Sequence, residues 1–184
     1  MTKRLFISIM LPSEWQSAFA NYYAQFSARD VRWTPKEDIH ITSCFLGDVE
    51  EARVNEIKEK IKELCAQTKS FSLSFEKITF APPGMPPRMV WAVFQESDAY
   101  ERLVENMQKE LRGFLAVEPH EETIPHATLA RFKDPALAQA INVEKTLPEL
   151  ASFDVHSVEL VESCLDPAGV RYKTLETFSF GKAV

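Results

Sequence analysis

The sequence is poor in cysteine and has no long apolar run. Its 184 residues include 3 cysteines, at positions 44, 65 and 164, with no CxxC pair. An odd number of widely spaced cysteines fits neither a disulfide framework nor a zinc site. No apolar run approaches the roughly 20 residues that span a bilayer. The stretch LFISIML near the start is short and precedes no small-residue cleavage site. We interpret it as the first strand of a cytoplasmic protein rather than as a signal peptide.

The chain also lacks an excess or a block of basic residues. Lys and Arg number 21 against 27 Asp and Glu, which gives a net charge of -6. Proteins that coat long nucleic acids neutralise many phosphates and carry a basic face. If this chain binds nucleic acid, we therefore expect recognition of an end or of a few nucleotides. The hydrophobic fraction of 45% is ordinary for a globular protein.

Apolar periodicity predicts a mixture of strands and helices. Alternation with period two predicts strands, and apolar residues at helical spacing predict helices. The expected strands cover residues 3–11, 38–46, 71–80, 88–95, 123–132, 153–161 and 170–180. The expected helices begin at side-chain caps, which are Ser13, Asp48, Ser97 and Asp134, and the last continues to about Lys145.

These elements recur in the same order in the two halves of the chain. The strand at Lys3 recurs at Arg88, and the strand that holds His40 recurs around His126, at offsets of 85 and 86 residues. Five elements at a nearly constant offset indicate an internal duplication. Two such halves commonly pack about a pseudo-two-fold axis, which places equivalent residues opposite each other across a cleft.

Each half carries one His-x-Thr motif within a predicted strand. These motifs are His40-Ile-Thr42 and His126-Ala-Thr128. Side chains alternate along a strand, so the histidine and the threonine of each motif share one face. Two imidazoles near neutral pH can act as a general acid and a general base. Two hydroxyls can hold the non-bridging oxygens of a phosphate, and a strained cyclic phosphate needs no metal for this chemistry.

Other functions of the motif residues also fit the sequence. His40 and His126 could bind zinc, although no HxH or HExxH pattern accompanies them. Cys44 shares the strand parity of His40, so a Cys–His nucleophile is conceivable. A small buried thiol is the simpler interpretation of Cys44. His120 and His156 lack a following threonine, and we interpret both as ordinary loop and strand residues.

With these motifs, the chain resembles the two-histidine phosphoesterase superfamily, and within it the LigT-like RNA 2′,3′-cyclic phosphodiesterases. That branch carries HITLxFLG and PHxTLAR, which stand here as HITSCFLG (40–47) and PHATLAR (125–131). The flanking segments RLFISI, RWTPKEDIH, PPRMVWAVF and VELVESCLDPAGVRYKTLETFSF are also similar. The resemblance covers essentially the whole chain.

The resemblance implies an α+β, bilobal fold over residues 1–184, treated as a single two-lobed domain. Two antiparallel-rich sheets would line a central cleft, with helices outside and an internal pseudo-two-fold axis. It implies hydrolysis of a terminal 2′,3′-cyclic phosphate to a 2′-phosphate, with reverse 2′-5′ ligation also accessible. The expected partners are RNA ends or nucleotide 2′,3′-cyclic phosphates. We expect no cofactor, metal or membrane, no obligate protein partner, and a monomer.

The resemblance also assigns roles to individual residues. His40 would protonate the leaving O3′, and His126 would activate the water. Thr42 and Thr128 would bind phosphate oxygens. The remaining substrate-binding candidates are Arg131, which follows the second motif, and Arg88, which follows a proline-rich loop.

Three features leave this assignment incomplete. Ser43 replaces the usual leucine of the first motif, on the face expected to pack against the helices with Ile41 and Phe45. Arg131 has the opposite strand parity to His126, so it reaches a phosphate only if the strand bends, and otherwise it would pair with a carboxylate. Three aromatic residues could stack on a base or belong to the core, namely Trp33, Phe45 and Tyr172.

Two other functions also fit the motifs. One is a relative that acts on another cyclic or 2′-5′-linked nucleotide, such as ADP-ribose 1″,2″-cyclic phosphate. The other is a catalytically inactive RNA-end binder.

Overall fold

The computed structural model describes residues 1–26, 31–114, 124–141, 143, 150–166 and 169–181. The strands are β1 (Thr2–Met10), β2 (Arg32–Trp33), β3 (His40–Glu50), β4 (Phe71–Ala81), β5 (Met89–Phe94), β6 (His126–Arg131), β7 (Ser152–Val155), β8 (Ser157–Asp166) and β9 (Gly169–Ser179). The α-helices are α1 (Ser13–Tyr23), α2 (Val54–Gln67) and α3 (Asp98–Glu110). Short 3₁₀ segments are η1 (Lys36–Asp38), η2 (Glu51–Arg53), η3 (Arg112–Phe114) and η4 (Pro135–Ala140).

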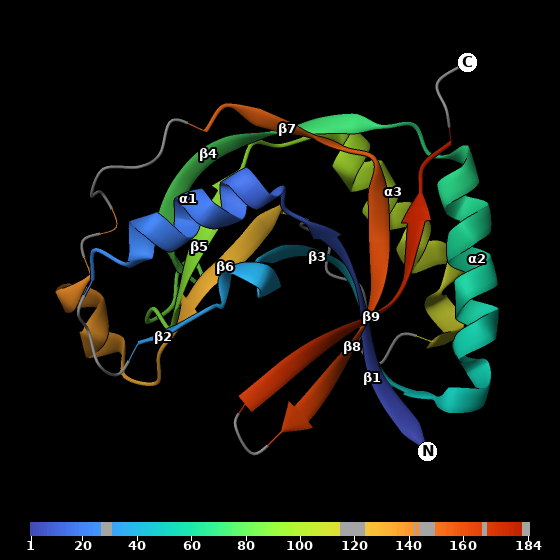
Figure 1. Cartoon of the computed structure of the whole chain (residues 1–184), viewed down its shortest axis with the longest axis horizontal. Helices are drawn as coiled ribbons and strands as arrows, with labels where there is room; N and C mark the ends of the chain where they lie inside the picture. The colour runs from blue at the N-terminus through green and yellow to red at the C-terminus, as the bar shows by residue number, and fades with distance from the viewer. Residues whose placement is uncertain (27–30, 115–123, 142, 144–149, 167–168, 182–184) are drawn as a thin grey trace.

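The strands form one curled antiparallel sheet in the order β7-β4-β5-β6-β3-β1-β8-β9, with β2 beside β6 (Figure 1). This confirms the predicted α+β class. The two expected sheets are the two halves of this sheet, β7-β4-β5-β6 and β3-β1-β8-β9. They are joined where Ile41 of β3 pairs with Ala127 of β6. The two motif strands are therefore neighbours at the centre of the sheet.

The strand pairing shows the duplication directly. In one half β1 lies between β3 and β8, and in the other half β5 lies between β6 and β4. Each of the triplets β3-β1-β8 and β6-β5-β4 thus takes two strands from one half of the chain and its third strand from the other. This exchange is the arrangement expected for two repeats related by a pseudo-two-fold axis.

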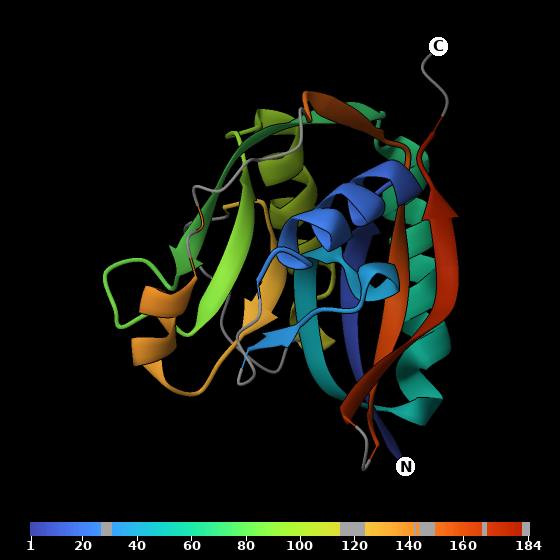
Figure 2. The same ribbon diagram turned by 60° about the vertical axis from the view of Figure 1, so that its left-hand side comes forward.

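Helix α1 packs against one half of the sheet, and helices α2 and α3 pack against the other half (Figure 2). Helix α1 buries Trp15 and Phe19, and the Trp15 ring lies 5.0 Å from the Phe153 ring and 5.7 Å from the Phe94 ring. Helix α1 therefore packs against the half that contains β4, β5 and β7. Helices α2 and α3 pack together and contact β9 and β3 of the other half. The burial of large aromatic and aliphatic side chains is the main stabilising contribution here.

Several predicted helix starts differ from the structure. Helix α2 begins at Val54, because β3 continues to Glu50 and holds Asp48 within the strand. There Asp48 lies 3.6 Å from the Arg4 guanidinium instead of capping a helix. Helix α1 begins at Ser13 without a side-chain cap. The Ser97 cap is confirmed, because its hydroxyl accepts a hydrogen bond from the Tyr100 amide at 3.4 Å.

The predicted last helix is also different from expectation. Asp134 does accept a hydrogen bond from the Ala136 amide, but the segment that follows is the 3₁₀ turn η4, which ends at Ala140. Lys145 lies outside the described residues. In the part of the chain that the structure describes, no helix has the length and apolarity required to cross a bilayer.

Gly47 allows β3 to bend in the middle of its pairing with β1. Its φ is 76°, in the left-handed region, and the register between β1 and β3 shifts at this point, between Leu5 and Phe6. A residue with a Cβ atom is disfavoured in this conformation by roughly 1–2 kcal/mol. The curvature of β3 therefore depends on glycine at this position.

We expect Gly47→Ala to lower the free energy of unfolding by about 1 kcal/mol or more. Urea denaturation followed by circular dichroism measures the change. Gly113→Ala is the matched control, because Gly113 has no positive φ and open space where a Cβ would stand. Equal effects of the two substitutions would show that the φ of Gly47 carries no stability cost.

Candidate active site

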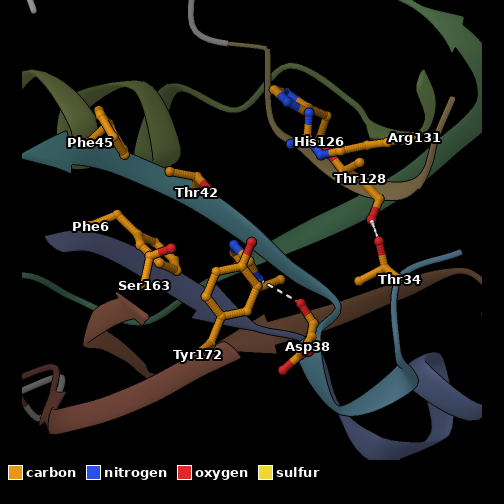
Figure 3. Close-up of a pocket in the computed structure, with 11 residues that line it drawn as sticks. Phe6, Thr34, Asp38, Thr42, Phe45, His126, Thr128, Arg131, Ser163 and Tyr172 are labelled. Atoms are coloured by element: carbon orange, nitrogen blue, oxygen red, sulfur yellow. Dashed lines mark hydrogen bonds between the residues drawn. The ribbon is translucent and has the colours of Figure 1, made fainter. Parts of the chain in front are cut away.

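A pocket of about 190 Å³ lies on the concave face where β3 meets β6 (Figure 3). It collects residues from β1, β3, β6, β8, β9 and the loop that precedes β3. Its lining residues are Phe6, Thr34, Asp38, His40, Thr42, Phe45, His126, Thr128, Arg131, Ser163 and Tyr172. Both His-x-Thr motifs therefore open onto one cavity, as the duplication predicts.

The two histidines are held in the same way. The Nδ1 atom of His40 lies 2.6 Å from the carbonyl oxygen of Asp38, and the Nδ1 atom of His126 lies 2.8 Å from that of Ile124. A carbonyl oxygen only accepts hydrogen bonds, so each Nδ1 carries the proton. Each neutral ring then has its second nitrogen, Nε2, as an unprotonated acceptor. The backbone two residues upstream thus fixes both the tautomer and the orientation of each imidazole.

A β-bulge follows each motif and changes which side chains face the pocket. In β3, Ile7 pairs with Cys44 and Ser8 with Thr42, so Ser43 has no partner in the register. Beyond this extra residue the alternation is reversed. Phe45 therefore lines the pocket, with 37% of its surface exposed. The prediction that Phe45 faces the helices was wrong.

The second bulge has the same effect on Arg131. In β6, Val90 pairs with Ala130 and Trp91 with Thr128, so Leu129 is the extra residue. Arg131 then lies on the same face as His126 and Thr128 and lines the pocket (Figure 3). Its guanidinium contacts the Met89 sulfur at 3.0 Å, and it forms no ion pair with any described residue. Strand parity alone predicts the opposite orientation.

Thr34 supports the bulge in β6 from the neighbouring loop. Its hydroxyl donates a hydrogen bond to the Thr128 carbonyl at 2.8 Å (Figure 3). Its amide donates to the Leu129 carbonyl at 2.8 Å. A bulge disrupts regular ladder pairing, and these two bonds satisfy carbonyl groups next to it. Thr34 was not predicted as a site residue, although it belongs to RWTPKEDIH, one of the segments that carry the resemblance.

Aromatic rings pack against both imidazoles. The Trp91 ring stacks on His126 with 3.7 Å between ring centroids. On the other side of the pocket, the Phe6 ring stacks on His40 at 5.0 Å, and the Tyr172 ring meets His40 edge-on at 5.2 Å. These contacts restrict rotation of the imidazoles about their side-chain bonds.

The surroundings of the histidines favour their neutral forms. Burial lowers the pKa of His40 and that of His126, partly opposed by their backbone hydrogen bonds. The positive charge of Arg131 lowers both pKa values further, and His126 also lowers that of His40. An anion bound among these groups would have the opposite effect, because it stabilises the imidazolium form.

Cys44 lies on the packed side of β3. It is buried, and burial raises the pKa of its thiol to about 12. The thiolate needed for nucleophilic attack is therefore scarce at neutral pH, and the bulge turns the side chain away from His40. These facts contradict the Cys–His alternative. Within the described residues, no group of three or more His, Cys, Asp or Glu side chains is arranged to hold a metal ion.

Comparisons with known proteins agree with this geometry. Residues 9–91 match the model of the family described as LigT like Phosphoesterase. An RNA 2′,3′-cyclic phosphodiesterase of Aeropyrum pernix is 31% identical over 144 residues, which are 76% of this chain and 80% of the relative. The chain belongs to the LigT-like phosphoesterase family.

Further relatives support this membership over nearly the full length. A protein of the same name from Thermotoga maritima is 27% identical over 182 residues, covering 96% of this chain and 95% of the relative. The crystal structure of TT0787 of Thermus thermophilus superposes with a TM-score of 0.83 at 28% identity, over 96% and 97% of the two chains.

The structure of this LigT-like phosphoesterase separates the predicted site residues into two groups. The pocket brings together His40, Thr42, His126, Thr128 and Arg131, with Phe45 and Tyr172 at its wall. Arg88 is exposed and is absent from the pocket lining. Trp33 stacks on Tyr23 and Phe26 away from the pocket. His156 is exposed and contacts the Ser70 hydroxyl at 3.0 Å, and His120 lies outside the described residues.

Other pocket residues were missed as site residues in the sequence. Phe6, Asp38 and Ser163 line the pocket from β1, η1 and β8. Phe6 belongs to RLFISI and Asp38 to RWTPKEDIH, two of the segments that carry the resemblance. Their position in these segments was the available signal, but it did not indicate which side chains face the cavity.

We expect Arg131→Gln to raise the pKa values of both His40 and His126. A cation disfavours the protonated imidazole, so its removal makes protonation easier and moves both titrations to higher pH. Titration of the imidazole proton resonances by NMR measures the change. Arg88→Gln is the control and should leave both titrations in place. Unchanged pKa values in Arg131→Gln would mean that the guanidinium does not act on the imidazoles.

Proposed function

We propose that this chain hydrolyses the terminal 2′,3′-cyclic phosphate of RNA or of nucleotides to a 2′-phosphomonoester. The observation that carries the proposal is the pair of oriented imidazoles, each with Nδ1 bound to a carbonyl, on a single pocket with two threonines. The names of the relatives support the substrate class. A metal-independent, two-histidine acid–base mechanism fits these groups.

In this mechanism His126 Nε2 accepts a proton from water while the water oxygen attacks phosphorus. The bond between phosphorus and O3′ breaks, and protonated His40 donates its Nε2 proton to O3′. The product carries the phosphate on O2′ and a free 3′-hydroxyl. One imidazole gains a proton and the other loses one, so a proton exchange with solvent restores the starting state. Each proton transfer typically contributes about 10²–10⁴-fold to the rate.

Phosphoryl transfer depends mainly on position and on charge stabilisation. Thr42 and Thr128 supply hydroxyl donors to the non-bridging oxygens from the two sides of the pocket. Arg131 supplies a positive charge without a competing carboxylate partner among the described residues. Ligation uses the same groups: a 5′-hydroxyl replaces water as the nucleophile and gives its proton to His126, O3′ leaves with the proton of His40, and the product contains a 2′-5′ linkage.

The decisive experiment is turnover of cytidine 2′,3′-cyclic phosphate in the presence of EDTA. We expect full activity in the chelator, with the product identified as the 2′-phosphate by ³¹P NMR or chromatography. A 3′-phosphate product would contradict the assignment of the leaving oxygen. Loss of activity in EDTA would indicate a metal-dependent enzyme, and tight binding without turnover would indicate an inactive RNA-end binder.

We expect His40→Ala and His126→Ala each to reduce kcat/KM by at least about 10², because each removes one proton-transfer group. Steady-state kinetics with the cyclic nucleotide measures the loss, and circular dichroism checks the fold. His156→Ala is the matched control, since this exposed histidine lies outside the pocket and its ring contacts the Ser70 hydroxyl. A near-normal rate in either pocket variant would refute the paired acid–base mechanism.

A further inference from the structure

A second and larger cavity adjoins the histidine pocket on the side of His126. It has a volume of about 750 Å³ and lies over β4, β5 and the start of α3. Trp91 separates the two cavities: its ring stacks on His126, which lines the first cavity, while Trp91 itself lines the second. The second cavity is therefore one indole ring away from the site of the proposed reaction.

The strand register places both cavities on the same face of the sheet. Across β6 and β5, His126 pairs with Val93 and Thr128 with Trp91. Across β5 and β4, Val93 pairs with Lys77 and Trp91 with Thr79. Directly paired residues share a face, so one surface continues from the motif strand across two more strands. Adjacent strands are about 4.8 Å apart, which puts β4 roughly 10 Å from β6.

The cavity beside His40 in the other half of the sheet is much smaller, with a volume of about 80 Å³, and Phe6 and Tyr172 line it. In that half Phe6 stacks on His40, as Trp91 stacks on His126 in the half with the larger cavity. The Tyr172 ring meets the Phe6 ring edge-on, with 5.2 Å between the ring centroids. Tyr172 reaches the cleft from β9, which pairs with β8 along its whole length. In the half with Trp91, the outer strand β7 pairs only with residues 71–74 of β4. Within the described ranges, no aromatic ring other than His126 contacts Trp91.

The chemistry of the second cavity suits a nucleobase rather than a phosphate. Two of its lining side chains, Trp91 and Val93, are apolar and share the face of the sheet that carries His126. Its rim carries several carboxylates, which are Glu76, Glu96, Asp98 and Glu101, against the single cation Lys77 among the described lining residues. Carboxylates repel phosphate oxygens but accept hydrogen bonds from the amino groups of bases. Unpaired bases commonly stack on aromatic side chains of proteins that bind single strands.

We propose that this cavity, formed around Trp91, Val93, Lys77 and Thr79, binds the base of the second-to-last nucleotide of an RNA end. This is the nucleotide on the 5′ side of the one that carries the cyclic phosphate. The inference rests on the proposed function and specifies its substrate: an RNA end of at least two nucleotides is preferred to a free cyclic mononucleotide. Stacking of one base contributes about 1–3 kcal/mol, which corresponds to roughly a 5- to 150-fold gain in kcat/KM.

The test compares kcat/KM for cytidine 2′,3′-cyclic phosphate with that for the dinucleotide ApC bearing the same cyclic end. We expect the wild-type chain to prefer the dinucleotide by about tenfold. Thr79→Trp fills the cavity and should abolish this preference while the mononucleotide is processed within about twofold of the normal rate. Lys77→Trp, at an exposed position of the same cavity, should have the same effect without a burden on folding.

Thr177→Trp, on the exposed outer strand β9, is the control and should keep the preference. Equal wild-type rates for the two substrates would overturn the proposed subsite and leave the proposed function intact. A preference that survives in both cavity variants would overturn it as well. Failure of the wild-type chain to turn over either substrate would overturn the proposed function, and the subsite with it.

Discussion

The site depends on the hydrogen bond between each histidine Nδ1 and a backbone carbonyl two residues upstream. This bond selects one tautomer, and it presents Nε2 to the pocket from both sides. The carbonyls belong to Asp38 and Ile124, immediately before β3 and β6. Because backbone carbonyls do not titrate, the orientation of the rings is independent of pH. The chemistry then depends only on the protonation of the two outward nitrogens.

The bulges in β3 and β6 complete the site. A regular strand would direct Phe45 and Arg131 toward the helices, where a buried guanidinium without a partner is costly. Instead each strand gains one residue after its threonine, and the side chain five positions after the histidine returns to the concave face. The repeats differ at this position, with an apolar ring in one and a cation in the other. The pocket is symmetric in its acid–base groups and asymmetric in its charge.

Much of this arrangement could be predicted from the sequence. The alternation of apolar residues located most of the strands, and the constant offset between the halves placed the two motifs opposite each other. The faces of His40, Thr42, His126 and Thr128 follow from strand parity alone.

Parity failed at Ser43 and Leu129, because a bulge depends on pairing with β1 and β5, which lie far away in the chain. The cap predicted at Asp48 failed because tertiary pairing extended β3 past that residue. Asp134 does cap the segment that follows it, as predicted, but this segment is the 3₁₀ turn η4 and not an α-helix.

The junction between β7 and β8 has a consequence for the width of the cleft. Only His156 separates the two strands, yet β7 pairs with β4 in one half of the sheet and β8 pairs with β1 in the other. The covalent chain thus fastens the halves together at a point remote from the central contact between Ile41 and Ala127. Separation of the two halves would require a change of backbone conformation at this one-residue connection. The two halves are therefore connected at two places, by this single residue and by the pairing of β3 with β6, and the Tyr172 side chain lies at the wall of the pocket between them.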